Sequence, residues 1–446
     1  STVRIETRAG TLGDGEERSV PILSRGLPRV ICFGGMTRNK RAVIEIPVTR
    51  EHSLTETSLE LDLTPHPALA GLASLDYLSG FPYGCVEQTL NSLVPVLSYT
   101  NALMDLGATP EAMPHIQARV ASGLGKLADF QASGGGFGWW KDSEPDFYLT
   151  SLVLLGLSKV RGVEQAKVGK ITASAAKFVR EQIRMEPIED LAALGLYALS
   201  EAGYQERVIL EGLKSRMDRM DALTLSLTTL ALANHGLTKE AGEAGKSLSR
   251  MLVHDREGAY FPVTASRENQ PAAETAAYGL LALLRTQPGS PDVDEILNWL
   301  VLQKTGRYWT STKTTGTVIS AIAEYIRLRK DAISLVDQEI AVALNGGEAV
   351  RFRITRSDIL QGKAQVVSIP CDGLVYGKNR IEIGVEQDLA YALKLETVLE
   401  ADPILPGSSG CDLPVTKKIQ AVTRVQDARG NPRLLSRPLE EREGLD

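Results

Sequence analysis

The sequence predicts a chain of mixed α and β structure, in which a long helical region interrupts two segments of antiparallel β-structure. Two observations support this fold class. The first 60 or so residues, and those between about 335 and 400, alternate apolar and polar residues in the manner of half-buried strands. Between about 68 and 328, apolar residues recur at intervals of three and four, which is the period of amphipathic helices.

The β-rich segments contain runs such as "RAVIEIPVTR" and "TSLELDLTP" near the start, and "QEIAVALNGGEAVRFRIT" and "NRIEIGVEQ" near the end. Each half alone has too few strands to bury two faces. We therefore expect the two halves to pair into one antiparallel β-sandwich, into which the helical region is inserted through a surface loop. The expected domains are residues 1–63 and 334–402 for the sandwich and 64–333 for the helices, while 403–446 form a linker and the truncated start of a further β-domain or a tail.

A unit repeats within the helical region. Three stretches each combine a helix end, a Gly- and aromatic-rich loop and an apolar helix: "LADFQASGGGFGWWKDSEPDFYLTSLVLLGLSKV", "LVHDREGAYFPVTASRENQPAAETAAYGLLALLRT" and "LVLQKTGRYWTSTKTTGTVISAIAEYIRL". Helix pairs that recur at roughly forty residues suggest a closed or solenoid array, and an ordinary helical bundle is the alternative. In the first loop, glycines 134–136 and 138 let the backbone pass beneath Phe137, Trp139 and Trp140, and no phosphate-loop signature follows them.

Composition excludes several classes of partner. The chain of 446 residues carries 55 acidic and 49 basic residues, a net charge of -6, and no basic block that would follow a phosphate backbone. No apolar run is long enough to span a bilayer. Four cysteines and five scattered histidines lack the spacing of a metal site, so we expect neither a metal nor a cofactor. A bridge among Cys32, Cys371 and Cys411 stays open.

The stretch "SGFPYGCVEQTLNSLVPVLSY" holds the main candidate for chemistry. A turn at Pro82, Tyr83 and Gly84 precedes a helix that starts at about Cys85. Residues three apart share a helix face, so the Cys85 thiol can meet the Gln88 side chain, displace ammonia and close an internal thioester. Such a bond survives only if water is excluded. Candidate shielding residues are Phe81, Tyr83, Leu90 and Leu93. The alternative is a buried cysteine with a purely structural role.

The sequence "PYGCVEQ", followed by an apolar helix, resembles the thioester motif of the α2-macroglobulin and complement family. Val86 in place of the glycine common in animal members points to the bacterial branch. The resemblance covers roughly residues 20–400. It implies that the helical region is a toroid called the thioester domain, related in fold to terpenoid cyclases and prenyltransferases, and inserted into a β-sandwich called the CUB domain.

The resemblance implies a single-use covalent protease trap, an endopeptidase inhibitor and not a turnover enzyme. Cys85 would supply the thiol and Gln88 the acyl group, with Glu87 as the motif acid and Pro82, Tyr83 and Gly84 as the turn. Its partners would be proteases, captured through lysine amines, and the remaining macroglobulin domains of a longer parent chain. That parent would be periplasmic or extracellular, with a lipid anchor upstream in a Gram-negative envelope.

Family members that prefer hydroxyl groups use a histidine in the second toroid repeat as an acyl relay. Here the second repeat, "FVREQIRMEPIEDLAALGLYALSEAG", contains no histidine, and His115, His235 and His254 lie elsewhere. We therefore expect direct attack by amines. Three alternatives stay open: a cyclase-like or prenyltransferase-like enzyme in the toroid, a protease with Cys85 as nucleophile, and an interaction module without a thioester.

Overall fold

The computed structural model describes residues 2–9, 12–19, 26–79, 84–108, 116–160, 164–186, 188–262, 272–305, 307–333, 335–361, 365–399, 420–426 and 432–438. The chain divides into two units. One comprises Ser1–Leu27 and Leu399–Asp446, and the other comprises Pro28–Val398. The first unit contains two hairpins, one of β1 (Thr2–Ala9) with β2 (Leu12–Ser19), the other of β13 (Gln420–Gln426) with β14 (Pro432–Pro438).

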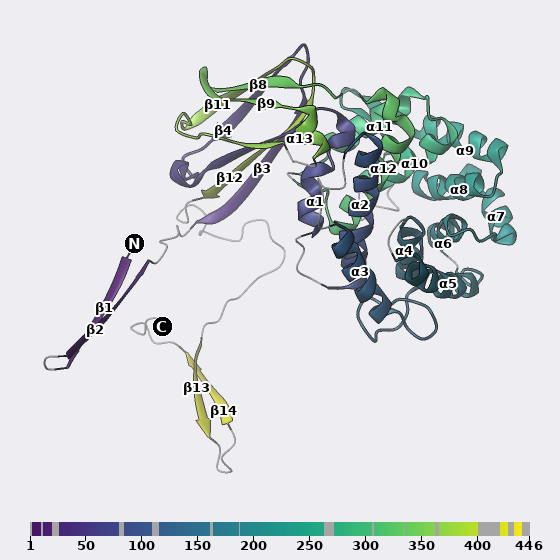
Figure 1. Cartoon of the computed structure of the whole chain (residues 1–446), viewed down its shortest axis with the longest axis horizontal. Coiled ribbons are helices and arrows are strands. Elements are labelled where there is room, and N and C mark those ends of the chain that lie inside the picture. The colour runs from purple at the N-terminus through teal and green to yellow at the C-terminus, as the bar shows by residue number, and fades with distance from the viewer. Residues whose placement is uncertain are drawn as a thin grey trace. The chain divides into compact units, whose positions relative to one another are not determined.

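The second unit contains a β-sandwich whose strands come from both ends of its sequence. The first sheet has the strand order β10 (Val366–Ile369), β5 (Ser58–Thr64), β12 (Ala390–Leu399), β3 (Leu27–Met36). The second sheet has the strand order β4 (Arg41–Val48), β11 (Gly377–Val385), β8 (Gln338–Leu344), β9 (Gly347–Ile354). All the pairs resolved between β5, β10 and β12, and between β4, β8, β9 and β11, are antiparallel. Figure 1 shows the early strand β4 in the same sheet as the late strands β8 and β11, and its direct neighbour is β11. The two β-rich segments therefore pair as expected, except that β1 pairs with β2 alone among the described strands.

Alternation along the strands builds the core of the sandwich. In β4 every second residue is buried, ending with Ile44, Ile46 and Val48 on the inner face. The facing residues Ile381 and Ile383 of β11 are also fully buried. Residues of the two sheets belong to one continuous apolar core, as in other β-sandwiches. The short helix α13 (Arg356–Leu360) and the 3-10 turn η1 (Leu54–Glu56) connect strands of the sandwich.

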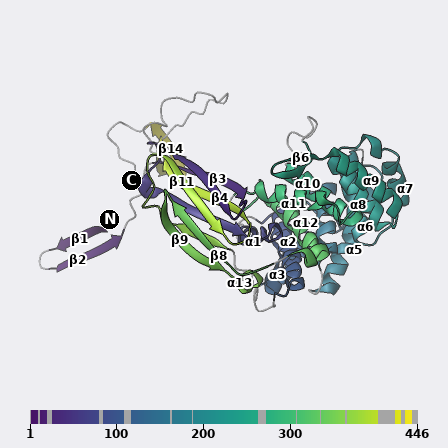
Figure 2. The ribbon, with the colours of Figure 1, turned by 90° about the horizontal axis from the view of Figure 1, so that it is seen from above.

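The helical part is a closed ring of helix pairs, which is one of the two arrays that the repeat suggested and the one that the resemblance implied. The inner helices contact one another in the order α2 (Val86–Asp105), α4 (Phe147–Ser158), α6 (Glu189–Glu201), α8 (Ala222–Asn234), α10 (Ala272–Thr286), α12 (Thr312–Arg329), and α12 returns to α2. Outside them lie α1 (Leu72–Ser79), α3 (Ile116–Phe130), α5 (Gln165–Gln182), α7 (Arg207–Lys214), α9 (Thr238–Met251) and α11 (Pro291–Leu302). Figure 2 shows α7 and α9 at the periphery of this ring. The connections include η2 (Pro67–Leu69), η4 (Met217–Arg219), η6 (Lys330–Ala332) and the hairpin of β6 (Val253–Asp255) with β7 (Gly258–Tyr260).

The first and third aromatic loops are anchored alike, as expected for repeated units. The backbone N–H of Phe137 donates to the hydroxyl of Thr150 at 2.8 Å, and that of Trp309 donates to Thr315 at 2.9 Å. Each threonine lies four residues after the residue that caps its helix, Asp146 or Ser311. Phe137 and Trp309 are fully buried.

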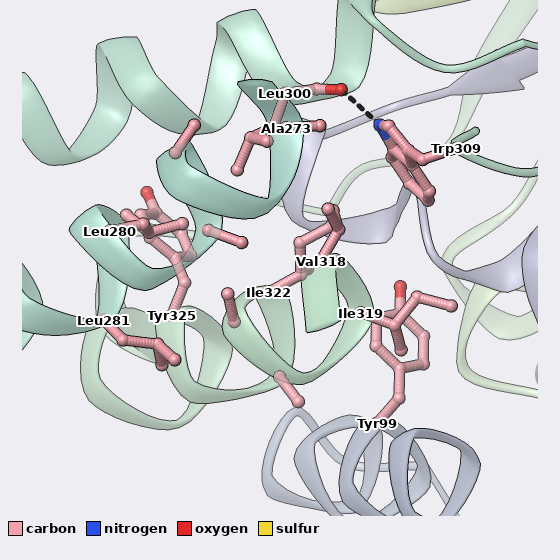
Figure 3. Close-up of a cluster of buried hydrophobic side chains, with 14 of the residues drawn as sticks. Tyr99, Ala273, Leu280, Leu281, Leu300, Trp309, Val318, Ile319, Ile322 and Tyr325 are labelled. Atoms are coloured by element: carbon pink, nitrogen blue, oxygen red, sulfur yellow. Dashed lines mark hydrogen bonds between the residues drawn. The ribbon is translucent and has the colours of Figure 1, made fainter. Parts of the chain in front are cut away.

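Apolar side chains of the last inner helices, α10 and α12, pack together with those of the first inner helix, α2. In Figure 3, Val318, Ile319 and Ile322 of α12 lie between α10 and the side chain of Tyr99 from α2. The indole Nε1 of Trp309 donates to the carbonyl oxygen of Leu300 at 2.7 Å. Inner helices such as α4 and α8 are buried on nearly every side, as helices in the middle of a large core must be.

Candidate functional site

Cys85 is the N-cap residue of α2. Its backbone is extended, with φ -71° and ψ 165°, and its Sγ accepts the backbone N–H of Gln88 at 3.4 Å. The side chain is 5% exposed. A capping side chain turns back over the first helical turn to reach the free N–H groups there. The sulfur of Cys85 therefore lies over the turn that carries Gln88.

The side chain of Gln88 brings an amide to the same turn. Its Oε1 is buried and has no hydrogen-bond partner within the part of the chain that the structure describes. The Cys85 thiol is free in this structure. Burial raises the pKa of that thiol, and the nearby Glu87 charge adds to the rise, while backbone N–H groups oppose it. A protonated, enclosed thiol is a poor target for reagents in the solvent.

Glu87 ties the first turn of α2 to the first turn of α12. Its carboxylate accepts the side-chain amide of Asn91 at 2.6 Å and the hydroxyl of Thr312 at 3.3 and 3.4 Å. Burial raises the pKa of this carboxyl, and these hydrogen bonds only partly offset the effect. Glu87 thus holds two neighbouring inner helices together directly beside Gln88.

Aromatic residues from outside the motif surround this end of the ring. The carbonyl oxygen of Trp139 accepts the backbone N–H of Val86 at 3.1 Å, so the first aromatic loop lies against the start of α2. Tyr77 of α1 stacks on Tyr308, with ring centres 4.7 Å apart. The charge of Glu87 contributes to a raised pKa of Tyr77, behind the larger contributions of burial and of Tyr308. Sequence reasoning missed Tyr77, Tyr308 and Thr312, since only the ring closure brings them to the motif.

The predicted site residues differ in whether the structure describes them and in how far they are buried. Phe81, Pro82 and Tyr83 lie outside the described residues. Gly84 is exposed, directly before the cap. The two predicted shielding leucines, Leu90 and Leu93, are buried, at 5% and 3% exposure. Of the aromatic loop residues, Phe137 is buried, whereas Trp139 and Trp140 are 44% and 57% exposed.

Four histidines are described, and none contacts the motif. His235 lies at the C-terminal end of α8, where its Nδ1 is 2.8 Å from the carbonyl oxygen of Ala231. His254 lies on β6, 2.6 Å from Glu295. His115 lies outside the described residues. Cys85 and Cys371 are free thiols, and Cys32 is not bridged to Cys371. Cys32 lies on β3 and Cys371 follows β10, and these are the opposite edge strands of one sheet. Cys411 is not described.

A cavity of about 440 Å³ lies among the C-terminal ends of the inner helices and is lined by Lys159, Glu201, Arg285, Glu324 and Arg327. Burial raises the pKa of Glu324, but hydrogen bonds from Arg327 and the charges of Arg327 and Arg285 bring it below its ordinary value. This carboxylate is therefore ionised at neutral pH and is no proton donor of the kind a cyclase needs. No group of three potential metal ligands occurs within the described ranges. Nor is any described helix long and apolar enough to cross a membrane.

Comparisons with known proteins agree with this architecture. Residues 63–190 match the model of the A-macroglobulin TED domain family. A relative named alpha-2-macroglobulin from Thermotoga maritima is 26% identical over 337 residues, which are 74% of this chain and 20% of that protein. The alpha-2-macroglobulin of Escherichia coli K12 is 34% identical over 114 residues, which are 24% of this chain and 7% of that protein. The chain thus spans about a fifth of the first relative's length.

Solved structures share the fold. A crystal structure of native Escherichia coli alpha-2-macroglobulin, from domain MG7 to the C-terminus, matches 97% of this chain and 67% of its own with a TM-score of 0.57 and 16% identity. The structure of Salmonella alpha-2-macroglobulin reacted with methylamine covers 97% of this chain and 28% of its own, with a TM-score of 0.56 and 17% identity. The segment that matches the TED domain model covers the first helices of the toroid that is inserted into the β-sandwich. The chain is similar to bacterial α2-macroglobulins in sequence and in fold.

Proposed function

We propose that Cys85 and Gln88 form an internal thioester and that the chain traps proteases covalently. The observation that supports it is the cap geometry: the Cys85 sulfur lies over the turn that carries Gln88, with both reacting groups shielded by the ring. To form the bond, the thiolate attacks the amide carbon of Gln88 and ammonia leaves. The product is an acyl group with a good leaving group, stored away from water.

The trap reacts once. A lysine amine of a protease attacks the Gln88 acyl carbon, a C–N bond forms, and Cys85 leaves as a thiolate that then takes up a proton. The stable amide that remains holds the protease. Direct attack favours amines over hydroxyl groups, because amines are intrinsically better nucleophiles. His235 and His254 make their hydrogen bonds elsewhere, with Ala231 and Glu295. Proteases and further macroglobulin domains are the proposed partners, and a periplasmic or extracellular parent protein is the proposed setting.

The experiment compares intact masses before and after methylamine. A native mass lower by one ammonia, followed by addition of one methylamine and release of one free thiol, is expected. Cys85→Ala removes the leaving group and must abolish the incorporation, whereas Cys371→Ala, a change at another free cysteine, must leave it intact. A wild-type protein with an unmodified mass and a titratable Cys85 would instead identify an interaction module without a thioester.

A further inference from the structure

Glu274, Tyr148 and Lys313, in the first turns of three inner helices, form a cluster that we call the ammonium cage. The Nζ of Lys313, from α12, lies 2.9 Å from Oε1 of Glu274, from α10. The same Nζ lies 5.1 Å from the centre of the Tyr148 ring, from α4. An acidic group and an aromatic face are the two kinds of partner that bind an ammonium ion best. Lys313 therefore occupies a site built for an amine.

The ammonium cage adjoins the acyl donor. Thr312, which precedes Lys313, donates its hydroxyl to Glu87, which precedes Gln88. The charges of Lys313 and Glu274 both act on the carboxyl of Glu87, the first lowering its pKa and the second raising it. All these residues lie in the first turns of inner helices. The cage and the proposed thioester are therefore on the same side of the ring, where the inner helices begin.

The ammonium cage has unused capacity. Glu274 is 3% exposed, and its second oxygen, Oε2, is buried without a hydrogen-bond partner in the described part of the chain. A carboxylate can accept about four hydrogen bonds, and leaving a buried one unpaired costs on the order of 1–3 kcal/mol. Lys313 also lines a cavity of about 60 Å³, together with residues such as Asn91 and Tyr278. That volume is enough to hold several water molecules.

We propose that Glu274, with Tyr148, is the specificity-determining site that admits a protonated amine to the acyl group of Gln88, and that Lys313 holds the place of that amine until it arrives. This inference rests on the proposed thioester. The ammonium group loses a proton to Glu274 or to water, its nitrogen attacks the acyl carbon, the C–S bond breaks, and the Cys85 thiolate takes up a proton. A neutral hydroxyl group gains nothing from the cage, so amines are selected by binding as well as by nucleophilicity.

The test compares two nucleophiles at one neutral pH. Methylamine is an ammonium ion there, like a lysine side chain, whereas hydroxylamine is a weaker base and is neutral. Glu274→Gln keeps the shape but removes the charge. We expect it to lower the ratio of the methylamine rate to the hydroxylamine rate by about tenfold, equivalent to about 1.4 kcal/mol. Glu211→Gln, which breaks an exposed Glu–Lys pair on α7, must leave the ratio unchanged. If Glu274→Gln leaves the methylamine-to-hydroxylamine ratio unchanged, the proposed role of the cage is wrong.

Glu274→Gln leaves Lys313 without its carboxylate partner and can therefore fold poorly. Two further variants test the proposal in that case. Glu274→Gln combined with Lys313→Gln removes both charges and must lower the ratio as well. Lys313→Gln alone empties the cage and must lower the half-saturating methylamine concentration several-fold, with no change for hydroxylamine. An unchanged half-saturation contradicts the placeholder role. Wild-type protein that consumes neither nucleophile and has an unmodified mass would overturn the thioester itself, and the cage with it. If the thioester is intact and Glu274→Gln leaves the ratio of the methylamine rate to the hydroxylamine rate unchanged, only the proposal about the cage is wrong.

Discussion

A thiol that caps a helix experiences two opposed influences at the scale of one residue. The N–H groups of the first turn stabilise the thiolate, as they stabilise other anions at helix N-termini. Enclosure in a low-dielectric ring favours the neutral thiol. In Cys85 the second effect dominates, because burial is the largest contribution to its raised pKa. The site therefore protects the sulfur chemically as well as sterically.

The reactivity of the unacylated thiol tests this balance. In Gln88→Ala no thioester can form, so Cys85 stays a buried thiol. We expect its alkylation by iodoacetamide, followed by mass spectrometry over a pH series, to show a midpoint above that of an ordinary cysteine, since burial raises the pKa. Unfolding the same variant in urea should return the midpoint to the ordinary value. A midpoint below the ordinary value would mean that the helix N-terminus governs the thiol.

Glu87 gives a pH-dependent prediction with a definite sign. Burial raises the pKa of its carboxyl above the unfolded value. The stability that this group contributes is therefore complete below the unfolded pKa and is lost as the pH rises through the folded pKa. Glu87→Gln stays neutral and can still accept hydrogen bonds from Asn91 and Thr312. We expect the free energy of unfolding of the variant, relative to wild type, to increase from pH 4 to pH 8 in urea titrations. A relative stability that falls with pH would contradict the raised pKa.

At the scale of elements, the close approach of α12 to α2 depends on one small residue. A Cβ at Gly316 would collide with Oδ1 of Asn91 and lie 3.1 Å from Cγ of Pro95. Overpacking a tight helix contact costs about 1–3 kcal/mol. We expect Gly316→Ala to lower the free energy of unfolding by that amount. Gly212→Ala, in α7, meets nothing within 4 Å and should stabilise by about 0.5–1 kcal/mol. Equal effects of the two changes in urea titrations would refute the packing argument.

Local sequence patterns predicted those features that depend only on a few consecutive residues. The spacing of Cys85 and Gln88 on one helix turn, and the repeated Gly- and aromatic-rich loops, could be deduced because both depend on a few consecutive residues. The ammonium cage could not, because Tyr148, Glu274 and Lys313 come from three helices and meet only when the ring closes. Nothing in the sequence around Lys313 or Glu274 indicates that their side chains meet.

At the scale of the whole molecule, alternation identifies strands but not their partners. The pattern in residues 2–19 suits a sandwich strand as well as a hairpin, and in the structure β1 pairs with β2. The pairing of β4 with β11, across more than 300 residues, followed instead from a physical need, since neither half could bury two faces alone. The boundaries of the expected domains, such as 63/64 and 402/403, stay a prediction.

The sandwich and the ring are joined by a buried ion pair. Nζ of Lys304, in the segment between α11 and α12, lies 2.8 Å from Oδ2 of Asp62 on β5 and 3.0 Å from the carbonyl oxygen of Ala70. The side chains are 3% and 12% exposed. The same segment continues to Thr312, which contacts Glu87 beside the proposed thioester. Only seven residues therefore separate Lys304 at this junction from Thr312 beside the proposed thioester.

Removing one partner of such a pair leaves an uncompensated buried charge, which costs about 3–5 kcal/mol. We expect Lys304→Met to destabilise the protein by that amount in thermal or urea unfolding, because Asp62 then lies buried without its cation. Asp62→Leu combined with Lys304→Met removes both charges and should recover most of the loss, giving a coupling energy in a double-mutant cycle. The exposed pair Lys378–Glu45, 85% and 66% exposed, is the matched control, and Lys378→Met should change stability by less than about 1 kcal/mol. If the losses of the two buried single changes simply add in the double variant, the pair does not hold the sandwich and the ring together.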